Sequence, residues 1–295
     1  MWLAIAFHFV SMLGRERSSC SINMESYDIV VLAGQSNAEG RGLGQGKYSF
    51  QTNPRVMEYI DPYPFRMEKN AEGEDWLVMH EPPRFVLKEN AEEKNQKGEA
   101  LASLIPTFAS CYLQKVLAPN RKLLIVKAAV DGTGFYWRDQ WGKGERLTKR
   151  LFQVTEEALH LGTSSRLVAV LWHQGEHEVF ERPWLKDEER KALYHRCFLE
   201  LIEEFRSRFG NIPWIAGEGT KRWEKDYPHE SKAVWDAAKE VIEEVRNAAF
   251  VSSDGLLSNE EEIHNGDLLH FSRRSQEILG ERYFASLELL LTNQK

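Results

Sequence analysis

The sequence predicts an α/β fold, a three-layer sandwich in which a parallel sheet of about five strands lies between two layers of helices. Two observations support this prediction. Short apolar runs rich in β-branched residues alternate along the chain with longer amphipathic segments. The runs are largely apolar, as strands of a parallel sheet are when helices cover both faces. Ligands of such folds bind beyond the carboxyl ends of the strands, so the polar residues that follow each strand are the candidates for a functional site.

Five apolar runs account for the strands, and five amphipathic segments account for the helices. The expected strands are residues 27–33, 122–130, 167–172, 212–216 and 249–252. The expected helices are residues 99–117, 145–161, 186–209, 231–248 and 272–291, the last with Ser272 as its N-cap. Residues 40–98 are rich in Gly, Pro, Asn and charged side chains, and we expect them to form long surface loops that shape a cleft.

Composition narrows the class of protein. The chain has 295 residues, of which 42% are hydrophobic, and this is enough to bury a sizeable core. The formal net charge of −7 gives no reason to expect nucleic acid or an anionic membrane as a partner, and a neutral or sugar-like substrate fits better. The cysteines, Cys20, Cys111 and Cys197, are far apart and form no CxxC pair, so neither a disulfide framework nor a structural zinc site is expected.

The beginning of the chain differs from the rest. We expect residues 1–24 to be a leader outside the fold and residues 25–295 to form a single domain. Residues 2–13 are largely apolar, but they are too few to span a bilayer, which needs ~20 apolar residues, and no other segment is expected to do so. If the leader is a signal peptide the protein is secreted, and if the start codon is assigned too early the protein is cytoplasmic.

The first strand is followed by the segment Gly34-Gln35-Ser36-Asn37. A serine that follows a buried strand beside a glycine can sit in a tight turn with its hydroxyl exposed, as the nucleophile of a hydrolase does. The same residues could equally form a polar turn that caps the next helix. The segment alone does not decide between these two interpretations.

Polar segments also follow the second and third strands. Residues 131–134 (Asp-Gly-Thr-Gly) could present the backbone N–H of Gly132 to a reacting carbonyl, although a plain strand-to-helix turn explains this segment better when it is taken alone. Residues 173–178 (His-Gln-Gly-Glu-His-Glu) hold more polar side chains than a turn needs, and Gln174 could donate its amide N–H to an oxyanion.

A fourth polar pair, Asp267 and His270, lies just before the last expected helix. An aspartate three residues before a histidine can reach the imidazole within a single turn. Its carboxylate would accept a hydrogen bond from one ring nitrogen and leave the other free to take a proton from a serine. Most D-x-x-H pairs are not catalytic, but the place of this one at the presumed active edge favours that role.

Taken together, these segments resemble the SGNH hydrolase superfamily, and within it the sialate O-acetylesterase-like group of carbohydrate esterase family 6. The resemblance extends from Tyr27 to about Phe284. It rests on residues 32–42 (LAGQSNAEGRG), 172–178 (WHQGEHE) and 267–271 (DLLHF), against family patterns of GQSN-x-x-G, W-x-Q-G-E-x-D and D-x-x-H-F. The resemblance implies an SGNH/flavodoxin-like fold.

The same resemblance implies a serine esterase that requires no metal ion and no cofactor. Ser36 would be the nucleophile, His270 the general base and Asp267 the residue that orients it. The implied oxyanion donors are the backbone N–H groups of Ser36 and Gly132 and the side chain of Gln174, with Gln35, Asn37 and Glu176 as supporting residues. The implied substrate is an O-acetylated carbohydrate of the sialic acid or xylan type or another small acyl ester, and the oligomeric state stays open.

Two positions depart from the family pattern. Glu178 stands where Asp is usual, which keeps the charge but lengthens the side chain. Asp131 precedes Gly132 where a second glycine is common. A carboxylate at this second position could weaken an oxyanion hole or narrow the range of substrates.

Three other functions are compatible with parts of the sequence. A metal hydrolase could use His173 and His177, but Gly175 interrupts the helical spacing that an H-E-x-x-H zinc motif needs. A nucleotide-binding protein could use the glycines of residues 40–46, but no helical pattern follows them.

The third alternative is a non-catalytic carbohydrate-binding protein. Such a protein could stack sugars on Trp137, Trp141 and Trp223, although packing in the core explains these side chains equally well. A pure binding protein would have no need of the serine, histidine and aspartate described above. The esterase interpretation therefore accounts for more of the sequence.

Overall fold

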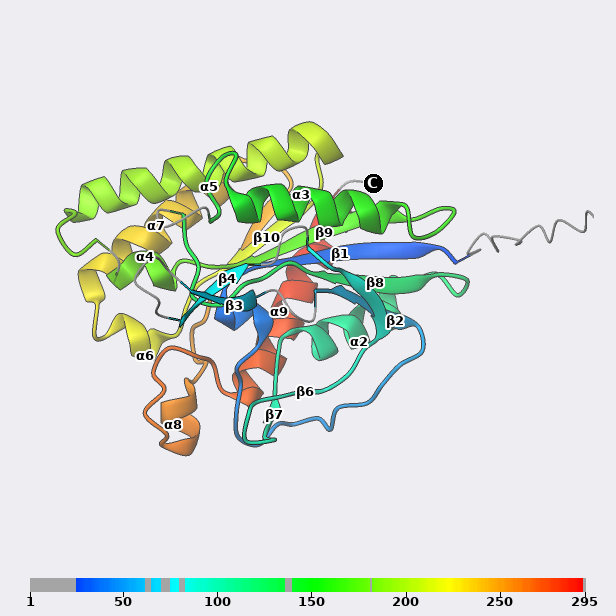
Figure 1. Cartoon of the computed structure of the whole chain (residues 1–295), viewed down its shortest axis with the longest axis horizontal. Coiled ribbons are helices and arrows are strands. Elements are labelled where there is room, and N and C mark those ends of the chain that lie inside the picture. Colours follow the sequence, from blue (N-terminus) through cyan, green and yellow to red (C-terminus); the bar gives the residue numbers. More distant parts are fainter. Residues whose placement is uncertain are drawn as a thin grey trace, which may run out of the picture.

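The structure is a computed structural model, and it describes residues 25–61, 65–69, 75–79, 83–135, 140–180 and 182–293. Its centre is a seven-stranded sheet in the order β11-β10-β9-β1-β8-β2-β5 (Figure 1). These strands are β1 (Tyr27–Gly34), β2 (Val56–Ile60), β5 (Val86–Glu89), β8 (Lys122–Lys127), β9 (Arg166–His173), β10 (Trp214–Gly217) and β11 (Ala248–Val251). All neighbours in the sheet pair in parallel except β5, which pairs antiparallel with β2 at the edge.

Helices cover both faces of the sheet (Figure 1). One face carries α3 (Arg146–Leu159), α5 (Asp187–Phe209) and α7 (Pro228–Glu244), and the other carries α2 (Ile105–Lys115) and α9 (Arg273–Thr292). The side-chain period of a strand explains the two layers: Ile29, Val31 and Ala33 of β1 belong to one apolar cluster, and Val30 and Leu32 belong to the other. The predicted three-layer α/β sandwich is confirmed.

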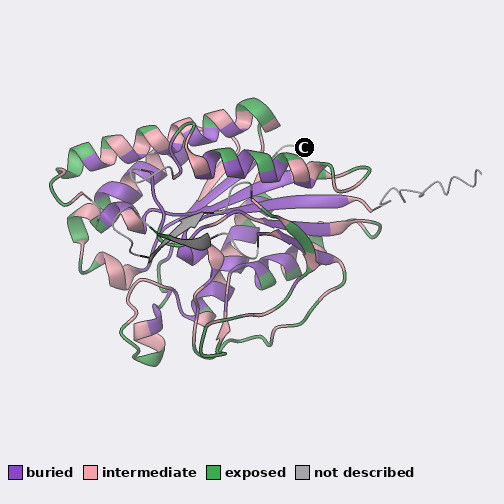
Figure 2. Cartoon of the chain, viewed as in Figure 1, coloured by how far each residue is buried: buried purple, intermediate pink, exposed green. Residues whose placement is uncertain are grey.

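Burial follows the same layers (Figure 2). Every residue of β1 is buried, and the long helices are buried on the sides that face the sheet and exposed on their outer sides. A strand that is covered on both faces needs a largely apolar sequence, and this is why the sequence predicted the central strands. The expected strands and most of the expected helices match the observed ones with small shifts at their ends.

Residues 40–98 hold more regular structure than expected, and the expectation of loops throughout is wrong. The strands β2 and β5 extend the sheet, which therefore has seven strands rather than about five. Two small antiparallel pairs complete this region, β3 (Phe65–Lys69) with β4 (Asp75–Met79) and β6 (Glu93–Lys94) with β7 (Ala100–Leu101). In β2 the buried Glu58 interrupts the apolar run, and Lys127 and Lys88 compensate its charge with Nζ–carboxylate distances of 3.2 and 3.4 Å.

Two expected helices have different limits. The helix expected from residue 99 begins at Ile105, because residues 100–101 pair as β7 and Pro106 suits a first helical turn. The helix expected over residues 231–248 spans residues 228–244, and Ala248 begins β11. Ser272 is the N-cap of α9, as predicted, and its hydroxyl accepts a hydrogen bond from the Ser275 N–H.

Four short helices complete the fold: α1 (Ser36–Glu39), α4 (Glu176–Phe180), α6 (Lys221–Glu224) and α8 (Asn259–Ile263). The first three follow the carboxyl ends of β1, β9 and β10 within a few residues. In the part of the chain that the structure describes, no helix is both long and apolar enough to cross a bilayer. The expected leader, with Cys20, lies outside the described residues, and Cys111 and Cys197 are free thiols that are half-buried.

Candidate functional site

The polar segments that follow the first three predicted strands meet at the carboxyl edge of the sheet, because β1 lies between β8 and β9. The N–H of Val130 donates to the Gly34 carbonyl (2.9 Å), and the N–H of Gln35 donates to the His173 carbonyl (3.0 Å). Gly34 is needed for this close approach: its φ is +126°, and a Cβ there would lie 2.1 Å from the His173 carbonyl oxygen. The turn after β1 is therefore fixed against the end of β9.

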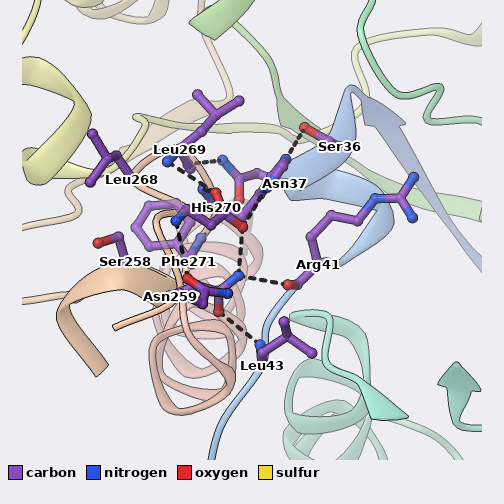
Figure 3. A network of polar contacts seen from close by, with 12 residues as sticks. Ser36, Asn37, Arg41, Leu43, Ser258, Asn259, Leu268, Leu269, His270 and Phe271 are labelled. Atoms are coloured by element: carbon purple, nitrogen blue, oxygen red, sulfur yellow. Dashed lines mark hydrogen bonds and ion pairs between the residues drawn. The ribbon is translucent and has the colours of Figure 1, made fainter. Parts of the chain in front are cut away.

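Ser36, His270 and Asp267 lie in one hydrogen-bonded chain at this edge, and Figure 3 labels the first two of them. Ser36 Oγ is 2.9 Å from His270 Nε2, and His270 Nδ1 is 2.9 Å from Asp267 Oδ2. Ser36 opens α1 directly beyond β1, while the other two residues lie on the loop before α9. With Nδ1–H donating to the carboxylate, Nε2 is left to accept the proton of the serine hydroxyl.

The Asp267 carboxylate accepts hydrogen bonds from four donor groups. Oδ2 accepts from His270 Nδ1 and from Asn259 Nδ2 (2.9 Å each), and Oδ1 accepts from the backbone N–H groups of Leu269 (3.2 Å) and His270 (3.1 Å). Burial raises the pKa of Asp267, but the hydrogen bonds from His270 and Asn259 outweigh it and hold the pKa below its usual value. The carboxylate is therefore ionised at neutral pH.

Asn259 is a site residue that the sequence analysis missed. Its buried amide donates to Asp267 Oδ2 and to the Arg41 carbonyl (3.0 Å), and its Oδ1 accepts from the Leu43 N–H (2.8 Å). It thus ties the loop of the candidate base to the segment that follows α1 (Figure 3). The only local signal was the Ser258-x-x-Glu261 spacing, which forms a capping box at the start of α8.

Asn37 holds the same loop from the other side. Its Nδ2 donates to the Leu269 carbonyl (3.1 Å), and its Oδ1 accepts from the Phe271 N–H (3.2 Å), so it contacts the backbone on both sides of His270. A further bond from Nδ2 to Glu176 Oε1 (2.6 Å) links this arrangement to the end of β9. Asn37 and Glu176, both expected as supporting residues, therefore contact each other and the loop that carries the imidazole.

Two backbone N–H groups that were expected to be oxyanion donors make no hydrogen bond within the described residues. Among the described residues, neither the Ser36 N–H nor the Gly132 N–H has a hydrogen-bond acceptor. Gly132 has a φ of +65°, and a Cβ there would meet no atom within 4 Å, so this residue borders open space. Both expected oxyanion donors of the backbone are thus available.

The third expected oxyanion donor, Gln174, points into a group of acceptors. Its Nε2 lies 3.3 Å from both Gln35 Oε1 and the Thr133 carbonyl, and it also donates to the Glu178 carboxylate. Because Gln35 precedes Ser36 and Thr133 follows Gly132 in the chain, the amide lies between the segments of the other two candidate donors. In this structure its hydrogens are engaged with protein acceptors.

Glu178, the first departure from the family pattern, is fully buried beside this amide. Its carboxylate accepts from Gln174 Nε2 and from the Phe135 N–H, and its longer side chain reaches both donors. Burial raises the pKa of Glu178 to about 7, although these two hydrogen bonds act in the opposite direction. Two donors do not offset complete loss of solvent.

Asp131, the second departure, is paired with Arg41. The guanidinium Nη2 of Arg41 lies 3.1 Å from Asp131 Oδ2 and 2.5 Å from Glu39 Oε2. Glu39 Oε1 also accepts the Asp131 N–H (2.9 Å), so Glu39 anchors the turn that carries Gly132. Burial raises the pKa of Glu39 to about 7, against the lowering effect of Arg41. Both Glu39 and Arg41 belong to the first motif, but the sequence analysis gave them no role.

The structure gives no support to the metal-binding and nucleotide-binding alternatives in the part of the chain that it describes. His173 is buried with its Nδ1 2.9 Å from the Tyr283 hydroxyl, and within the described residues no group of three or more His, Cys, Asp or Glu side chains could hold a metal ion. No helix follows the glycines of residues 40–46 up to residue 50. Trp141 is fully buried in the core, Trp223 is half-buried in α6, and Trp137 lies outside the described residues.

Comparison with known families adds independent information. Residues 26–288 match the family described as carbohydrate esterase, sialic acid-specific acetylesterase. The chain belongs to this family. The match spans nearly all of the described residues, and it confirms both the resemblance found in the motifs and the predicted enzyme class, a hydrolase of ester bonds.

Individual relatives are more distant. A probable 9-O-acetyl-N-acetylneuraminic acid deacetylase of Escherichia coli is 23% identical over 99 residues, which cover 32% of this chain and 30% of that protein. The alignment thus spans less than a third of that curated relative.

Solved structures show the same fold at low sequence identity. The crystal structure of NanS has a TM-score of 0.70 at 18% identity and covers 92% of this chain and 99% of its own. A protein from Arabidopsis thaliana has a TM-score of 0.61 at 20% identity, with 90% and 98% covered. A carbohydrate acetylesterase from Xanthomonas citri has a TM-score of 0.58 at 14% identity, with 90% and 57% covered.

Proposed function

We propose that this protein removes acetyl groups from O-acetylated carbohydrates, with Ser36 as nucleophile, His270 as general base and Asp267 as the residue that orients the imidazole. The observation that carries this proposal is the continuous hydrogen-bonded chain from the serine hydroxyl to the aspartate carboxylate, with both contacts at 2.9 Å. A buried serine could be a structural turn residue, but a turn does not require an imidazole and an ionised carboxylate aligned behind it.

The first half of the reaction forms an acetyl-enzyme. Ser36 Oγ attacks the carbonyl carbon of the acetyl ester while His270 Nε2 takes its proton, and the carbonyl oxygen becomes an oxyanion. The unused N–H groups of Ser36 and Gly132 are the donors proposed to stabilise this charge. When the carbon–oxygen bond to the sugar breaks, the imidazolium returns the proton to the departing sugar oxygen.

The second half restores the enzyme. A water molecule gives a proton to His270 and attacks the acetyl carbonyl, and the bond to Ser36 Oγ then breaks as the imidazolium returns the proton to that oxygen. The net reaction consumes one water and releases acetate and the free sugar hydroxyl. The ionised Asp267 carboxylate stabilises the imidazolium formed in each half.

We propose an O-acetylated sialic acid as the first substrate to test, because the family is described by sialic acid and the Escherichia coli relative is named for a 9-O-acetylated sialic acid. Acetylated xylan is the second candidate. Both present an acetyl ester on a sugar hydroxyl, which is the group that the chemistry above requires.

The test is acetate release from O-acetylated sialic acid, acetylated xylan and p-nitrophenyl acetate by wild-type protein and Ser36→Ala. We expect the substitution to lower kcat by on the order of 10⁶, because it removes the nucleophile. Ser207→Ala is a matched control, since this serine is exposed on α5 and its hydroxyl bonds only to the Glu204 carbonyl of its own helix. Equal rates for wild type and Ser36→Ala would contradict the proposal and favour a non-catalytic carbohydrate-binding protein.

A further inference from the structure

Three aromatic side chains form a connected row beside the candidate site. This aromatic row consists of Phe180 at the end of α4, Trp223 in α6 and Tyr227 just beyond α6. The ring centroids of Phe180 and Trp223 are 6.2 Å apart with the rings nearly perpendicular (89°), and those of Trp223 and Tyr227 are 4.5 Å apart. His177 packs edge-on against Phe180 at 5.1 Å and forms the inner end of the row.

Both helices that carry the aromatic row are fastened to the candidate active site. The backbone N–H of His177 in α4 donates to Gln35 Oε1 (3.2 Å), on the residue before the proposed nucleophile. Thr220, the N-cap of α6, donates its hydroxyl to the Leu268 carbonyl (2.7 Å), on the loop that carries the proposed base. The two helices lie beside each other at the carboxyl edge of the sheet (Figure 1). The aromatic row is therefore connected to the candidate site through both helices.

Two apolar side chains at the Phe180 end of the row are exposed, while Trp223 and Tyr227 are half-buried, and the segment around Phe180 is held in place. Phe180 is 42% exposed and Trp184, four residues further along the chain, is 75% exposed. The buried side chain of Arg190 donates to the carbonyls of Glu178 and Arg182, on both sides of Phe180. Exposed apolar side chains that gather at one place mark interaction surfaces, and rigid ones bind at a lower entropic cost.

We propose that the aromatic row and Trp184 form a subsite for the glycan chain that carries the acetylated sugar. Pyranose rings present flat faces of C–H groups, and aromatic rings bind such faces through dispersion and the hydrophobic effect. With an acetylated sugar at Ser36, the neighbouring sugar units of its chain reach the surface of α4 and α6. This inference rests on the proposed esterase function, and it assigns acetylated oligosaccharides and polysaccharides, rather than free acetylated monosaccharides, as the preferred substrates.

The kinetic test compares chain lengths. Acetylated xylohexaose is paired with acetylated methyl xyloside, and O-acetylated α2,8-linked sialic acid hexamer with O-acetylated sialic acid. The wild-type enzyme is measured on whichever pair it hydrolyses, and we expect its KM to be lower for the hexamer than for the monosaccharide of that pair. Trp184→Ala and Phe180→Ala should each raise that KM about five- to tenfold with little change in kcat, which is the contribution of one aromatic contact.

Leu289→Ala is the matched control, because Leu289 is 66% exposed on α9, away from the row, and its removal should change neither KM. Equal KM values for long and short substrates would overturn the subsite. So would a Trp184→Ala variant that keeps the wild-type preference for the hexamer.

A binding test separates this inference from the esterase proposal. Ser36→Ala should bind the unacetylated xylohexaose or sialic acid hexamer in calorimetry, and Ser36→Ala combined with Trp184→Ala should bind it about five- to tenfold more weakly. Calorimetry measures binding without turnover, so its result does not depend on the esterase activity. If Ser36→Ala hydrolysed p-nitrophenyl acetate as fast as the wild type, the esterase proposal would fail, but the binding subsite could still be tested. Binding of neither hexamer, or binding that is unaffected by Trp184→Ala, would overturn the subsite.

Discussion

Two carboxyl groups of the candidate site, those of Asp267 and Glu178, have pKa values that are shifted in opposite directions. Asp267, behind the imidazole, is partly exposed and accepts from four donor groups, and its pKa is below the usual value. Glu178, beside the Gln174 amide, is fully buried, and burial raises its pKa to about 7 although its carboxylate accepts from Gln174 and from the Phe135 N–H. Complete burial outweighs the hydrogen bonds at Glu178, whereas the hydrogen bonds outweigh burial at the partly exposed Asp267.

The proposed base side of the site, formed by Asp267 and His270, therefore has an ionised carboxylate near neutral pH, whereas the proposed oxyanion side, formed by Gln174 and Glu178, has a carboxyl group that titrates there. A permanently ionised Asp267 holds one tautomer of the imidazole across the physiological pH range. A carboxyl group that titrates near neutrality beside Gln174 changes the charge felt by that amide over the same range. The predictions that follow remove one element at a time, from the base side to the oxyanion side.

The largest effect among these is expected at Asp267. Asp267→Asn keeps the shape of the side chain but removes the charge that stabilises the imidazolium and fixes the tautomer, and we expect kcat to fall by about 10⁴. The measurement is the hydrolysis rate of p-nitrophenyl acetate. Asp236→Asn, on the outer part of α7 where it pairs with Lys232, should leave the rate unchanged. A fall of less than about tenfold for Asp267→Asn would show that the base side is not fixed by this charge.

Asn259 tests whether position as well as charge matters on the base side. Asn259→Ala removes one donor to Asp267 and both contacts to the segment after α1. A displaced imidazole loses its alignment with the serine, and we expect kcat to fall by about 10² with a smaller change in KM. Asn211→Ala, on an exposed turn after α5, is the control. An unchanged kcat would mean that the loop keeps its place without this side chain.

Much of this arrangement was predictable from the sequence, and the reason is local. The central strands are mostly apolar, and the polar residues that follow them are adjacent in the chain to those strands. Ser36 and the Asp267–His270 pair therefore stood out before any contact was known. Asp267 and His270 also lie within one turn of each other, so their hydrogen bond is a local property.

What escaped prediction depends on contacts between distant parts of the chain. Glu58 made β2 look polar, because its partner Lys127 comes from a different strand. Asn259 gains its role only when residues 41–43 and 267 are brought to it. The inward contacts of Gln174 with Glu178 arise from the fold of α4, and nothing in the motif indicated that the amide would be engaged in this way.

Glu178 tests the titrating side through stability. Below pH 4.5 this group is protonated in both folded and unfolded chains and imposes no cost. Between pH 4.5 and about 7 the folded protein keeps the proton that the unfolded chain releases, so the free energy of unfolding falls as the pH rises, by on the order of 3 kcal/mol.

Glu178→Gln has no carboxyl group at this position, so its free energy of unfolding should not fall in this way between pH 4.5 and 7. The measurement is the midpoint of urea unfolding of the wild type and of Glu178→Gln, each at pH 5 and at pH 8. Glu39, whose pKa is also raised to about 7, changes the stability of both proteins in the same direction and cancels in the comparison. An identical dependence on pH in wild type and Glu178→Gln would contradict the buried, titrating carboxyl group.

The smallest effect is expected at Asp131, at the outer edge of the oxyanion side. Its side chain is half-exposed, and its pairing with Arg41 is screened by water, so the interaction contributes at most about 1 kcal/mol. Because Glu39 bonds to the backbone N–H of residue 131 and not to its side chain, Asp131→Asn leaves the anchor of the Gly132 turn in place. We expect kcat/KM for p-nitrophenyl acetate to change by less than about fivefold. Glu39→Gln weakens the hydrogen bond to the backbone N–H of residue 131, and it should lower kcat/KM by more than Asp131→Asn does. A larger loss of kcat/KM for Asp131→Asn than for Glu39→Gln would mean that the side chain of Asp131, and not the bond to its backbone N–H, holds the Gly132 turn in place.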